Sequence, residues 1–228
     1  MQSVVILGAS CALGRALSER LTRTGTHVIP VDDVSVAGEG IHAIDVTDES
    51  AWTALVETIP ETGPVHLVVC AGAVDAGGLL DATPDVWDRT VRRNQLGPVV
   101  ATKRMLPALT HTRGSRALYI RSALGNSALA GAPLLHAAGG ALSQLARNVA
   151  VNHADKGLRA NAVLVSPYCV AFEELSLAMP DLLPENPPPQ SAPVGLDDVI
   201  EVIGFLLSPA SDGINGAEIP VDGGYLAQ

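Results

Sequence analysis

A short turn near the start of the chain has the residue types and spacing that hold a phosphate group. Gly8, Ser10 and Gly14 lie between the apolar run 4–7 and a helical pattern. Strand, glycine-rich turn and helix, in this order, place free backbone N–H groups and the positive end of a helix dipole against a pyrophosphate. Gly8 would allow a tight turn, and Gly14 would let the helix pack close to the strand. Alternatively, the two glycines form only a tight connection.

A pair of carboxylates follows this turn at about 20 residues' distance. The second apolar run ends in Val31, Asp32 and Asp33. A carboxylate at this place accepts hydrogen bonds from the hydroxyl groups of an adenosine ribose, and its charge repels a 2′-phosphate. With no Lys or Arg beside the pair, NAD is predicted in preference to NADP. The alternative is that Asp32 and Asp33 begin a solvated loop.

Seven short apolar runs alternate with helical patterns and would position these residues. The runs are 4–7, 28–31, 41–44, 67–69, 117–120, 162–165 and 217–221. Such runs are typical of strands that are buried on both faces of a parallel sheet. Their alternation with helices predicts a Rossmann-like, doubly wound α/β fold with right-handed crossovers, as one domain over residues 1–228.

Helix ends are marked at two places in the sequence. Thr47 is predicted to cap a helix whose first turn contains Asp48 and Glu49. A later helix is predicted over residues 196–207, because two Asp residues stand in its first turn and Ser208-Pro209 follows its end.

Composition limits the partners and the cellular setting. The chain of 228 residues has a formal net charge of −10, which disfavours nucleic acid and anionic membrane surfaces. Its apolar runs are shorter than the roughly 18 residues that span a bilayer, and its start lacks the basic region of a signal peptide. We therefore expect a cytoplasmic protein that binds neither nucleic acid nor membrane.

Three cysteines, Cys11, Cys70 and Cys169, are too few and too far apart to predict a disulfide framework or a metal site. Reduced thiols are expected. Cys11 stands in the glycine-rich turn, where a helix N-terminus can lower the pKa of a thiol. The alternative is that it is a small packing residue.

Several short motifs, in order from residue 4 to residue 224, resemble those of the short-chain dehydrogenase/reductase family. The first turn resembles the family's Gly-x-x-x-Gly-x-Gly motif, with Ala12 at the middle glycine. The other matches are Asp45-Val46, Cys70-Ala71-Gly72, Asn94 with Gly97-Pro98, and Asp222-Gly223-Gly224. The resemblance implies a dinucleotide site made of Gly8, Ser10, Leu13, Gly14, Asp32, Asp45, Val46, Ala71 and Gly72. Alternatively, the methyl group of Ala12 crowds the pyrophosphate and prevents binding.

The catalytic residues of this family are only partly present. Family members use a Ser that binds the substrate oxygen, a Tyr that transfers the proton and a Lys that lowers the Tyr pKa. Ser122 matches the Ser, and Asn94 matches an Asn that holds a water of the proton relay. Leu135 and Gly139 occupy the Tyr and Lys positions, and neither can titrate or donate a proton. Without a base beside it, Ser122 is interpreted as a relic of the site or a local cap.

Other residues are candidates for the missing proton donor. His136 follows Leu135, and an imidazole is a capable general acid near neutral pH. However, the next helical position points about 100° away, so a satisfied or solvated His is the simpler interpretation. Tyr119 precedes Ser122 in a predicted strand, and Tyr168 follows the sixth apolar run. Tyr168 is the better placed of the two, near the expected nicotinamide.

The segment 171–195 contains Pro180, Pro184, Pro187, Pro188, Pro189 and Pro193. So many prolines preclude a long helix. The resemblance implies that this segment is a lid over the substrate, and a plain surface loop is the alternative.

These residues support more than one function. The first is an NAD(H)-linked oxidoreductase acting on a carbonyl or an alcohol, whose proton comes through water at Asn94, the Ser122 hydroxyl or a hydroxyl of the substrate. Positioning alone supplies part of the barrier reduction. The second is an inactive subunit that pairs with an active relative. The family forms oligomers through helices that match residues 91–110 and 135–152, so a homo-oligomer or a hetero-oligomer is expected. An NAD-binding regulatory protein would need only the dinucleotide residues.

Overall fold

The computed structural model describes residues 2–60, 62–70, 78–126, 133–169 and 187–228. At its centre lies a seven-stranded sheet in the order β3-β2-β1-β4-β5-β6-β7, in which neighbouring strands are parallel. The strands are β1 (Ser3–Leu7), β2 (His27–Asp33), β3 (His42–Ile44), β4 (Val65–Cys70), β5 (Arg116–Ser122), β6 (Arg159–Val165) and β7 (Glu218–Val221). The predicted doubly wound parallel sheet is confirmed.

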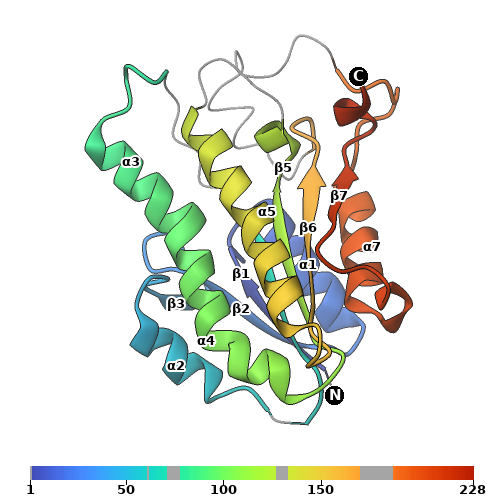
Figure 1. Cartoon of the computed structure of the whole chain (residues 1–228). Helices are drawn as coiled ribbons and strands as arrows, with labels where there is room; N and C mark the ends of the chain where they lie inside the picture. Colours follow the sequence, from blue (N-terminus) through green and yellow to red (C-terminus); the bar gives the residue numbers. More distant parts are fainter. Residues whose placement is uncertain (1, 61, 71–77, 127–132, 170–186) are drawn as a thin grey trace.

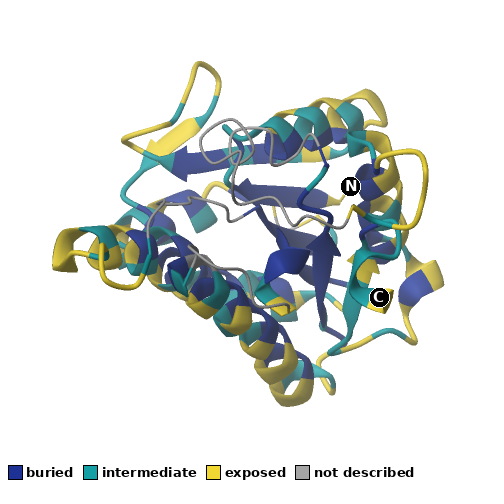
Figure 2. Cartoon of the chain, turned by 90° about the horizontal axis from the view of Figure 1, so that it is seen from above, coloured by how far each residue is buried: buried dark blue, intermediate teal, exposed yellow. Residues whose placement is uncertain are grey.

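Helices cover both faces of this sheet (Figure 1). One face carries α2 (Glu49–Val56), α4 (Gly97–His111) and α5 (Pro133–His153), and the other carries α1 (Ala12–Arg23) and α7 (Leu196–Leu207). The helix α3 (Pro84–Val91) runs into α4 through a single π-helical turn, η1 (Arg92–Leu96). Figure 2 shows that the inner strands and the sheet-facing sides of the helices are buried, whereas the edge strands β3 and β7 are partly or fully exposed.

The central strand β1 shows why the strands read as continuous apolar runs. Its alternate side chains point to opposite faces. Val5 and Leu7 pack in the core under α2, α4 and α5, whereas Val4 and Ile6 pack in the core under α1 and α7. Because both faces are covered, every position of β1 is buried and an alternating pattern would not fit.

The sheet has one point where the strand order reverses. The chain runs from β1 outward to β2 and β3, and then returns to the other side of β1 with β4. In such sheets a ligand binds beyond the carboxyl ends of the strands, at the crevice of the reversal. Gly8, Asp32 and Cys70 follow or end the strands that meet there. The fold therefore brings the candidate phosphate turn and the candidate ribose carboxylate to one edge.

One helix boundary was predicted correctly and one was not. The expected helix over residues 196–207 is present as α7. The predicted cap of α2 is wrong, because Asp48 is the N-cap and its Oδ1 accepts the Ser50 N–H at 2.8 Å. Thr47 instead donates its N–H and its hydroxyl to Oδ1 of Asp45. Because Thr47 is bound to Asp45, the next residue, Asp48, caps α2.

No helix within the described part of the chain combines the length and the apolar character needed to cross a bilayer. Among the same residues, no three or more His, Cys, Asp or Glu side chains gather as metal ligands would. Cys11, Cys70 and Cys169 are all free thiols.

Candidate functional site

The turn between β1 and α1 depends on glycine at two positions. Gly8 has a φ of +87°, and a methyl group on its α-carbon would lie 2.3 Å from the carbonyl oxygen of Cys70. A methyl group on Gly14 would lie 2.3 Å from the carbonyl oxygen of Gly8. Both distances are far below van der Waals contact. The end of β1, the end of β4 and the first turn of α1 therefore pack backbone against backbone.

Asp32 links the end of β2 to this turn. Its side chain is buried, its Oδ2 accepts the Ser10 N–H at 2.8 Å, and its Oδ1 accepts the Asp33 N–H at 2.8 Å. A carboxylate has about four acceptor positions, so each oxygen retains capacity for a ligand hydroxyl. Asp33 differs, because its Oδ1 is already bound by the N–H and hydroxyl of Ser35. Burial raises the pKa of Asp33, but these hydrogen bonds outweigh it and hold the pKa below its ordinary value.

These residues fit the phosphate and ribose of a dinucleotide. The hydroxyl oxygen of Ser10 is buried at the turn and has no hydrogen-bond partner among the residues described. The first turn of α1 contains no acidic residue, so the positive end of its dipole is not neutralised. Ala12 begins α1 and is partly exposed. Leu13 is buried in the core cluster under α1 and α7.

At the expected adenine position, Asp45 already has partners. Its Oδ1 accepts from Thr47, and its Oδ2 accepts from a guanidinium nitrogen of Arg92 at 2.5 Å. The hydrogen bonds from Thr47 and the charge of Arg92 lower the pKa of Asp45. Val46 is buried, and its carbonyl oxygen accepts the Trp52 indole N–H at 2.9 Å. An adenine that bonds to Asp45 must therefore share this carboxylate with Arg92. Ala71 and Gly72 lie outside the described residues.

Asn94 lies in the π-helical turn η1, between α3 and α4. It is the buried residue of this turn, and η1 packs against α5. Single π-turns inside helices are rare and are frequent at functional sites. The turn adds a residue to the helical repeat and so redirects the side chains that follow. The family resemblance implied a helix over residues 91–110 and did not indicate the π-turn.

Ser122 ends β5 and is buried at the carboxyl edge. Its Oγ accepts the N–H of Leu124 at 3.2 Å, which caps the short 3-10 turn η2 (Ala123–Asn126). The hydroxyl thus has the local capping role that was one of its two predicted interpretations. Its own proton remains for donation to another group.

The Lys position of the family, Gly139, lies against a buried arginine that the sequence analysis missed. A methyl group on Gly139 would lie 3.3 Å from the α-carbon of Gly125 and 3.5 Å from Nη1 of Arg121. Leu135, at the Tyr position, lies one helical turn earlier on α5. The first part of a longer side chain at residue 139 would therefore meet the Arg121 guanidinium.

Arg121 is held by acceptors from three parts of the chain. Its Nε donates to Ser143 Oγ at 2.7 Å, and its Nη1 donates to the Ser122 carbonyl oxygen at 3.1 Å. Its Nη2 donates to Asn126 Oδ1 and approaches Oε1 of Glu218 at 3.5 Å. Burial lowers the pKa of Arg121 and Glu218 opposes this effect, but a guanidinium stays charged in proteins. The only sequence signal was a charged residue within an apolar strand.

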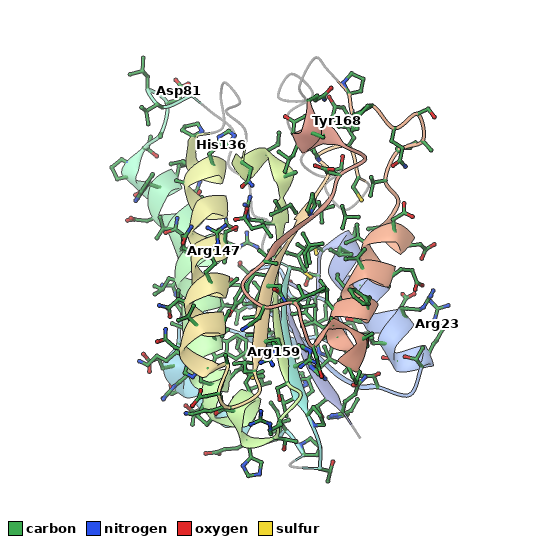
Figure 3. All side chains as sticks on the ribbon, turned by 45° about the vertical axis from the view of Figure 1, so that its right-hand side comes forward. Arg23, Asp81, His136, Arg147, Arg159 and Tyr168 are labelled. Atoms are coloured by element: carbon green, nitrogen blue, oxygen red, sulfur yellow. The ribbon has the colours of Figure 1, made fainter. Side chains whose placement is uncertain are left out.

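The candidate proton donors lie on opposite sides of the carboxyl edge. Figure 3 shows His136 at the start of α5 and Tyr168 beside the C-terminal segment. The Nε2 atom of His136 is buried without a partner among the described residues. Burial raises the pKa of Tyr168, and the nearby Tyr225 raises it further. Tyr119 is fully buried and bonds to Thr102 at 2.9 Å, so its hydroxyl does not face the edge.

The last residues of the chain hold the end of the proline-rich segment. Asp222 accepts the N–H groups of Gly224 and Leu226 at 2.9 Å, which forms a tight turn with positive φ at Gly224. The carbonyl oxygen of Gly223 accepts the N–H of Gln190 at 3.2 Å. Residues 171–186 of the predicted lid lie outside the described residues, but residues 187–195 pack on this turn.

Known proteins resemble this chain over nearly its whole length. A family model described as enoyl-(acyl carrier protein) reductase matches residues 8–226. The meso-2,3-butanediol dehydrogenase of Serratia marcescens is 30% identical over 240 residues, which cover 98% of this chain and 94% of that enzyme. The 2,5-dichloro-2,5-cyclohexadiene-1,4-diol dehydrogenase of Sphingobium indicum is 25% identical over 97% of this chain and 94% of its own length.

A solved structure agrees with the sequence matches. The oxidoreductase of the short chain dehydrogenase/reductase family from Burkholderia thailandensis is 27% identical, with a TM-score of 0.83, and the match covers 100% of this chain and 93% of that one. The family match runs from the glycine-rich turn to the C-terminal turn. The chain therefore belongs to the short-chain dehydrogenase/reductase family.

Proposed function

We propose that this family member is an NAD(H)-linked oxidoreductase that interconverts a carbonyl and an alcohol by a site without the Tyr–Lys pair. The observation that carries the proposal is the buried Asp32 carboxylate, bonded to the backbone of the glycine-rich turn with acceptor capacity remaining on both oxygens. A ribose diol matches this capacity, whereas a 2′-phosphate would be repelled. NAD is therefore the proposed cofactor.

Each of the retained residues has a task in this proposal. The backbone of Gly8, Ser10, Leu13 and Gly14 would bind the pyrophosphate at the start of α1, and the Ser10 hydroxyl would gain the partner that it lacks. Asp45 and Val46, together with Ala71 and Gly72, would hold the adenosine. When bound, the dinucleotide supplies or accepts the hydride.

The proton would move by a different route from that of the Tyr–Lys pair. Ser122 would orient the substrate oxygen through its hydroxyl proton, and Asn94 would hold a water in the relay. His136 and Tyr168 are the side chains that could replace the missing acid, and both lie at the carboxyl edge. Loss of a general acid costs roughly 10²- to 10⁴-fold in rate. Turnover is accordingly expected to be slow with simple alcohols.

The substrate class proposed is a secondary alcohol with a second hydroxyl nearby. One relative is named as a dehydrogenase of a vicinal diol, meso-2,3-butanediol, and another as a dehydrogenase of a cyclic 1,4-diol. A hydroxyl group next to the reacting carbon can pass the proton that no side chain of the Tyr–Lys type supplies. Such a substrate would compensate for part of the missing acid through its own geometry.

An oligomer built on α4 and α5 is proposed as the working form. Val99 on α4 and Val151 on α5 are large apolar side chains exposed to solvent, with Val151 80% exposed. Single exposed apolar residues are common. The resemblance to family members that pair through these helices makes this face the one to test, by sedimentation of the purified protein.

The test is a fluorescence titration of the purified protein with NADH and with NADPH. We expect NADH to bind more tightly than NADPH, and Asp32→Ala to weaken NADH binding by about tenfold or more. Asp33→Ala is the matched control, because this neighbouring carboxylate is bound to Ser35 and should change binding little.

Two results would count against the proposal. Preference for NADPH would contradict the assignment of Asp32 to the ribose. No binding of either nucleotide would remove the oxidoreductase function and would favour the inactive-subunit alternative. If NADH binds, oxidation of a vicinal diol should exceed that of the matching mono-alcohol, and equal rates would contradict the proposed substrate class.

A further inference from the structure

Two of the three cysteines meet at the glycine-rich turn. Cys11 is the N-cap of α1 and is partly exposed, whereas Cys70 ends β4 and is buried. Both contact the same residue: the Cys11 N–H donates to the Gly8 carbonyl oxygen at 3.3 Å, and a methyl group on Gly8 would lie 3.3 Å from Cβ of Cys70. Cys70 also belongs to the core cluster under α1 and α7, and Cys11 packs against this cluster.

The surroundings of Cys11 favour the thiolate form. Its Sγ accepts the Gly14 N–H at 3.2 Å, at the positive end of the α1 dipole. The hydrogen bond from Cys70 and the backbone N–H groups of α1 lower the pKa of Cys11, against the opposing effects of burial and of Asp32. A thiolate at a helix N-terminus is the reactive form of cysteine.

Cys70 is the complementary partner. Its hydrogen bond to Cys11 and its burial raise the pKa of Cys70 well above the ordinary value, so it stays protonated. The pair thus combines a partly exposed, thiolate-favouring cysteine with a buried thiol at the same glycine-rich turn. Reactive redox cysteines have low pKa values and solvent access and often stand next to a resolving cysteine.

We propose that Cys11 and Cys70 form a peroxide-reactive pair that closes to a disulfide across the glycine-rich turn. First, the Cys11 thiolate attacks one oxygen of hydrogen peroxide; an S–O bond forms, the O–O bond breaks, and the leaving hydroxide takes a proton to become water. Next, the Cys70 sulfur displaces the hydroxyl from the Cys11 sulfenic acid, and the thiol proton leaves with it as a second water. The two thiols lose two electrons, and one peroxide is reduced. A dithiol reductant reverses the reaction.

Disulfide formation would alter the phosphate turn. A sulfur–sulfur bond is about 2 Å long, so Cys11 Sγ must move toward β4 and away from the Gly14 N–H that it caps. The N-cap of α1 then shifts against the backbone packing of Gly8. This consequence rests on the proposed function: if the turn binds NADH, oxidation should weaken that binding by about tenfold.

The pair is tested by peroxide treatment of the reduced protein, alkylation of remaining thiols with N-ethylmaleimide in denaturant, and mass spectrometry of tryptic peptides. Trypsin separates the three cysteines, because Cys11 lies in peptide 1–15, Cys70 in peptide 24–89 and Cys169 in peptide 160–228. We expect peptide 1–15 to be disulfide-linked to peptide 24–89, while peptide 160–228 is alkylated. Cys169 is 1% exposed and serves as the internal control.

Serine variants separate the two roles. In Cys70→Ser, Cys11 should stop at the sulfenic acid and be trapped by dimedone. In Cys11→Ser the serine hydroxyl can still cap α1. Cys70 should then stay a reduced thiol after peroxide and be alkylated afterwards. Cys169→Ser should form the link as the wild type does. The proposal is overturned if peptides 1–15 and 24–89 are not linked, or if Cys169 is oxidised as readily as Cys11.

A parallel NADH titration distinguishes this proposal from the proposed function. Weaker NADH binding after oxidation, restored by dithiothreitol, would support both. A disulfide with unchanged NADH binding would overturn the effect on the phosphate turn. If the reduced protein does not bind NADH at all, the proposed function fails, while the mass measurement still decides the chemistry of the thiol pair.

Discussion

Two buried charges lie at the carboxyl edge of the sheet and use their hydrogen bonds differently. Asp32 accepts one backbone N–H on each oxygen and keeps further acceptor capacity. Arg121 directs its guanidinium to Ser122, Ser143, Asn126 and Glu218 of its own chain. Asp32 thus keeps acceptor positions that a ligand can use, whereas the guanidinium beside Gly139 links parts of its own chain.

This difference changes the meaning of the missing lysine. The space beside Gly139 is not empty, because the Arg121 guanidinium packs against Gly139 and Gly125. A positive charge remains in this region, but its hydrogen bonds serve the contacts among β5, η2, α5 and β7. In the proposed function the proton would therefore come from Ser122, Asn94, His136, Tyr168 or the substrate, because the hydrogen bonds of the Arg121 guanidinium are taken by its own chain.

The variant Arg121→Met tests whether the Arg121 guanidinium stabilises the fold, and it should have the largest effect. Removal of a buried partner leaves Glu218 and Asn126 without their guanidinium, so we expect a loss of about 4 kcal/mol of unfolding free energy. Arg147→Met is the matched control, because Arg147 also lies 3.5 Å from Oε1 of Glu218 but is half exposed. It should cost less than about 1 kcal/mol. Equal losses in urea unfolding would contradict a structural role specific to Arg121.

A third buried group, His66, lies at the amino edge of the sheet. Both ring nitrogens of His66 lack hydrogen bonds within the described part of the chain, and Arg116 lies beside it. Burial lowers the pKa of His66 to about 4, and the Arg116 charge contributes. The unfolded chain therefore binds more protons than the folded chain between about pH 6.5 and pH 4.

Acid lowers the stability of the folded chain through His66. Stability is complete above pH 6.5 and is lost as the pH falls toward 4, by about 3 kcal/mol in total from this residue. Urea unfolding as a function of pH measures it. His66→Leu should flatten the curve over this range, and an unchanged slope would mean that other groups carry the acid sensitivity.

Two alanine variants test how closely the glycine-rich turn packs against β4. Gly8 and Gly25 have similar φ values of +87° and +81°, but only Gly8 has backbone atoms in the space of a methyl group. Alanine should cost about 1 kcal/mol at Gly25 from backbone strain alone and about 3 kcal/mol at Gly8, where overlap with Cys70 is added. Similar losses at both positions would show that the turn can relax away from β4.

The smallest expected effect concerns the Lys position itself. Lysine at Gly140, which is exposed and open, should stabilise α5 by about 0.5–1 kcal/mol through helix propensity. The same substitution at Gly139 meets Gly125 and the Arg121 guanidinium, so the gain should be cancelled or reversed. Thermal unfolding of Gly139→Lys and Gly140→Lys compares them. Equal gains would indicate that Arg121 moves aside, and the Lys site could then be rebuilt.

The sheet could be predicted from the sequence because its signal is local. Runs such as 4–7 and 162–165 must be continuously apolar when helices cover both faces, and glycine at residues 8 and 14 marks the turn. The helix α7 was equally clear from its acidic first turn. In contrast, Thr47 and Asp48 are both good caps, and only the Asp45 turn decides between them.

Long-range partners and helical irregularities could not be predicted in the same way. Nothing near Arg121 in sequence reveals that Ser143 and Glu218 surround it, because these residues come from other elements. Likewise, the contact between Cys11 and Cys70 exists only because β4 is laid beside β1. The π-turn at Asn94 breaks the regular repeat on which helix prediction relies. The assignment of nucleotide-binding residues stays a prediction that the titrations test.

The turn formed by Asp222, Gly223 and Gly224 has a practical consequence for handling the protein. It carries the final residues to the carboxyl edge, where the short helix Tyr225–Ala227 contacts η2 and the Gln228 amide approaches the Pro187 carbonyl oxygen at 3.4 Å. Figure 1 shows the N-terminus at the opposite edge. An affinity tag fused behind Gln228 would lie at the carboxyl edge, on the same side as the candidate site, so purification and assays should use a tag ahead of Gln2.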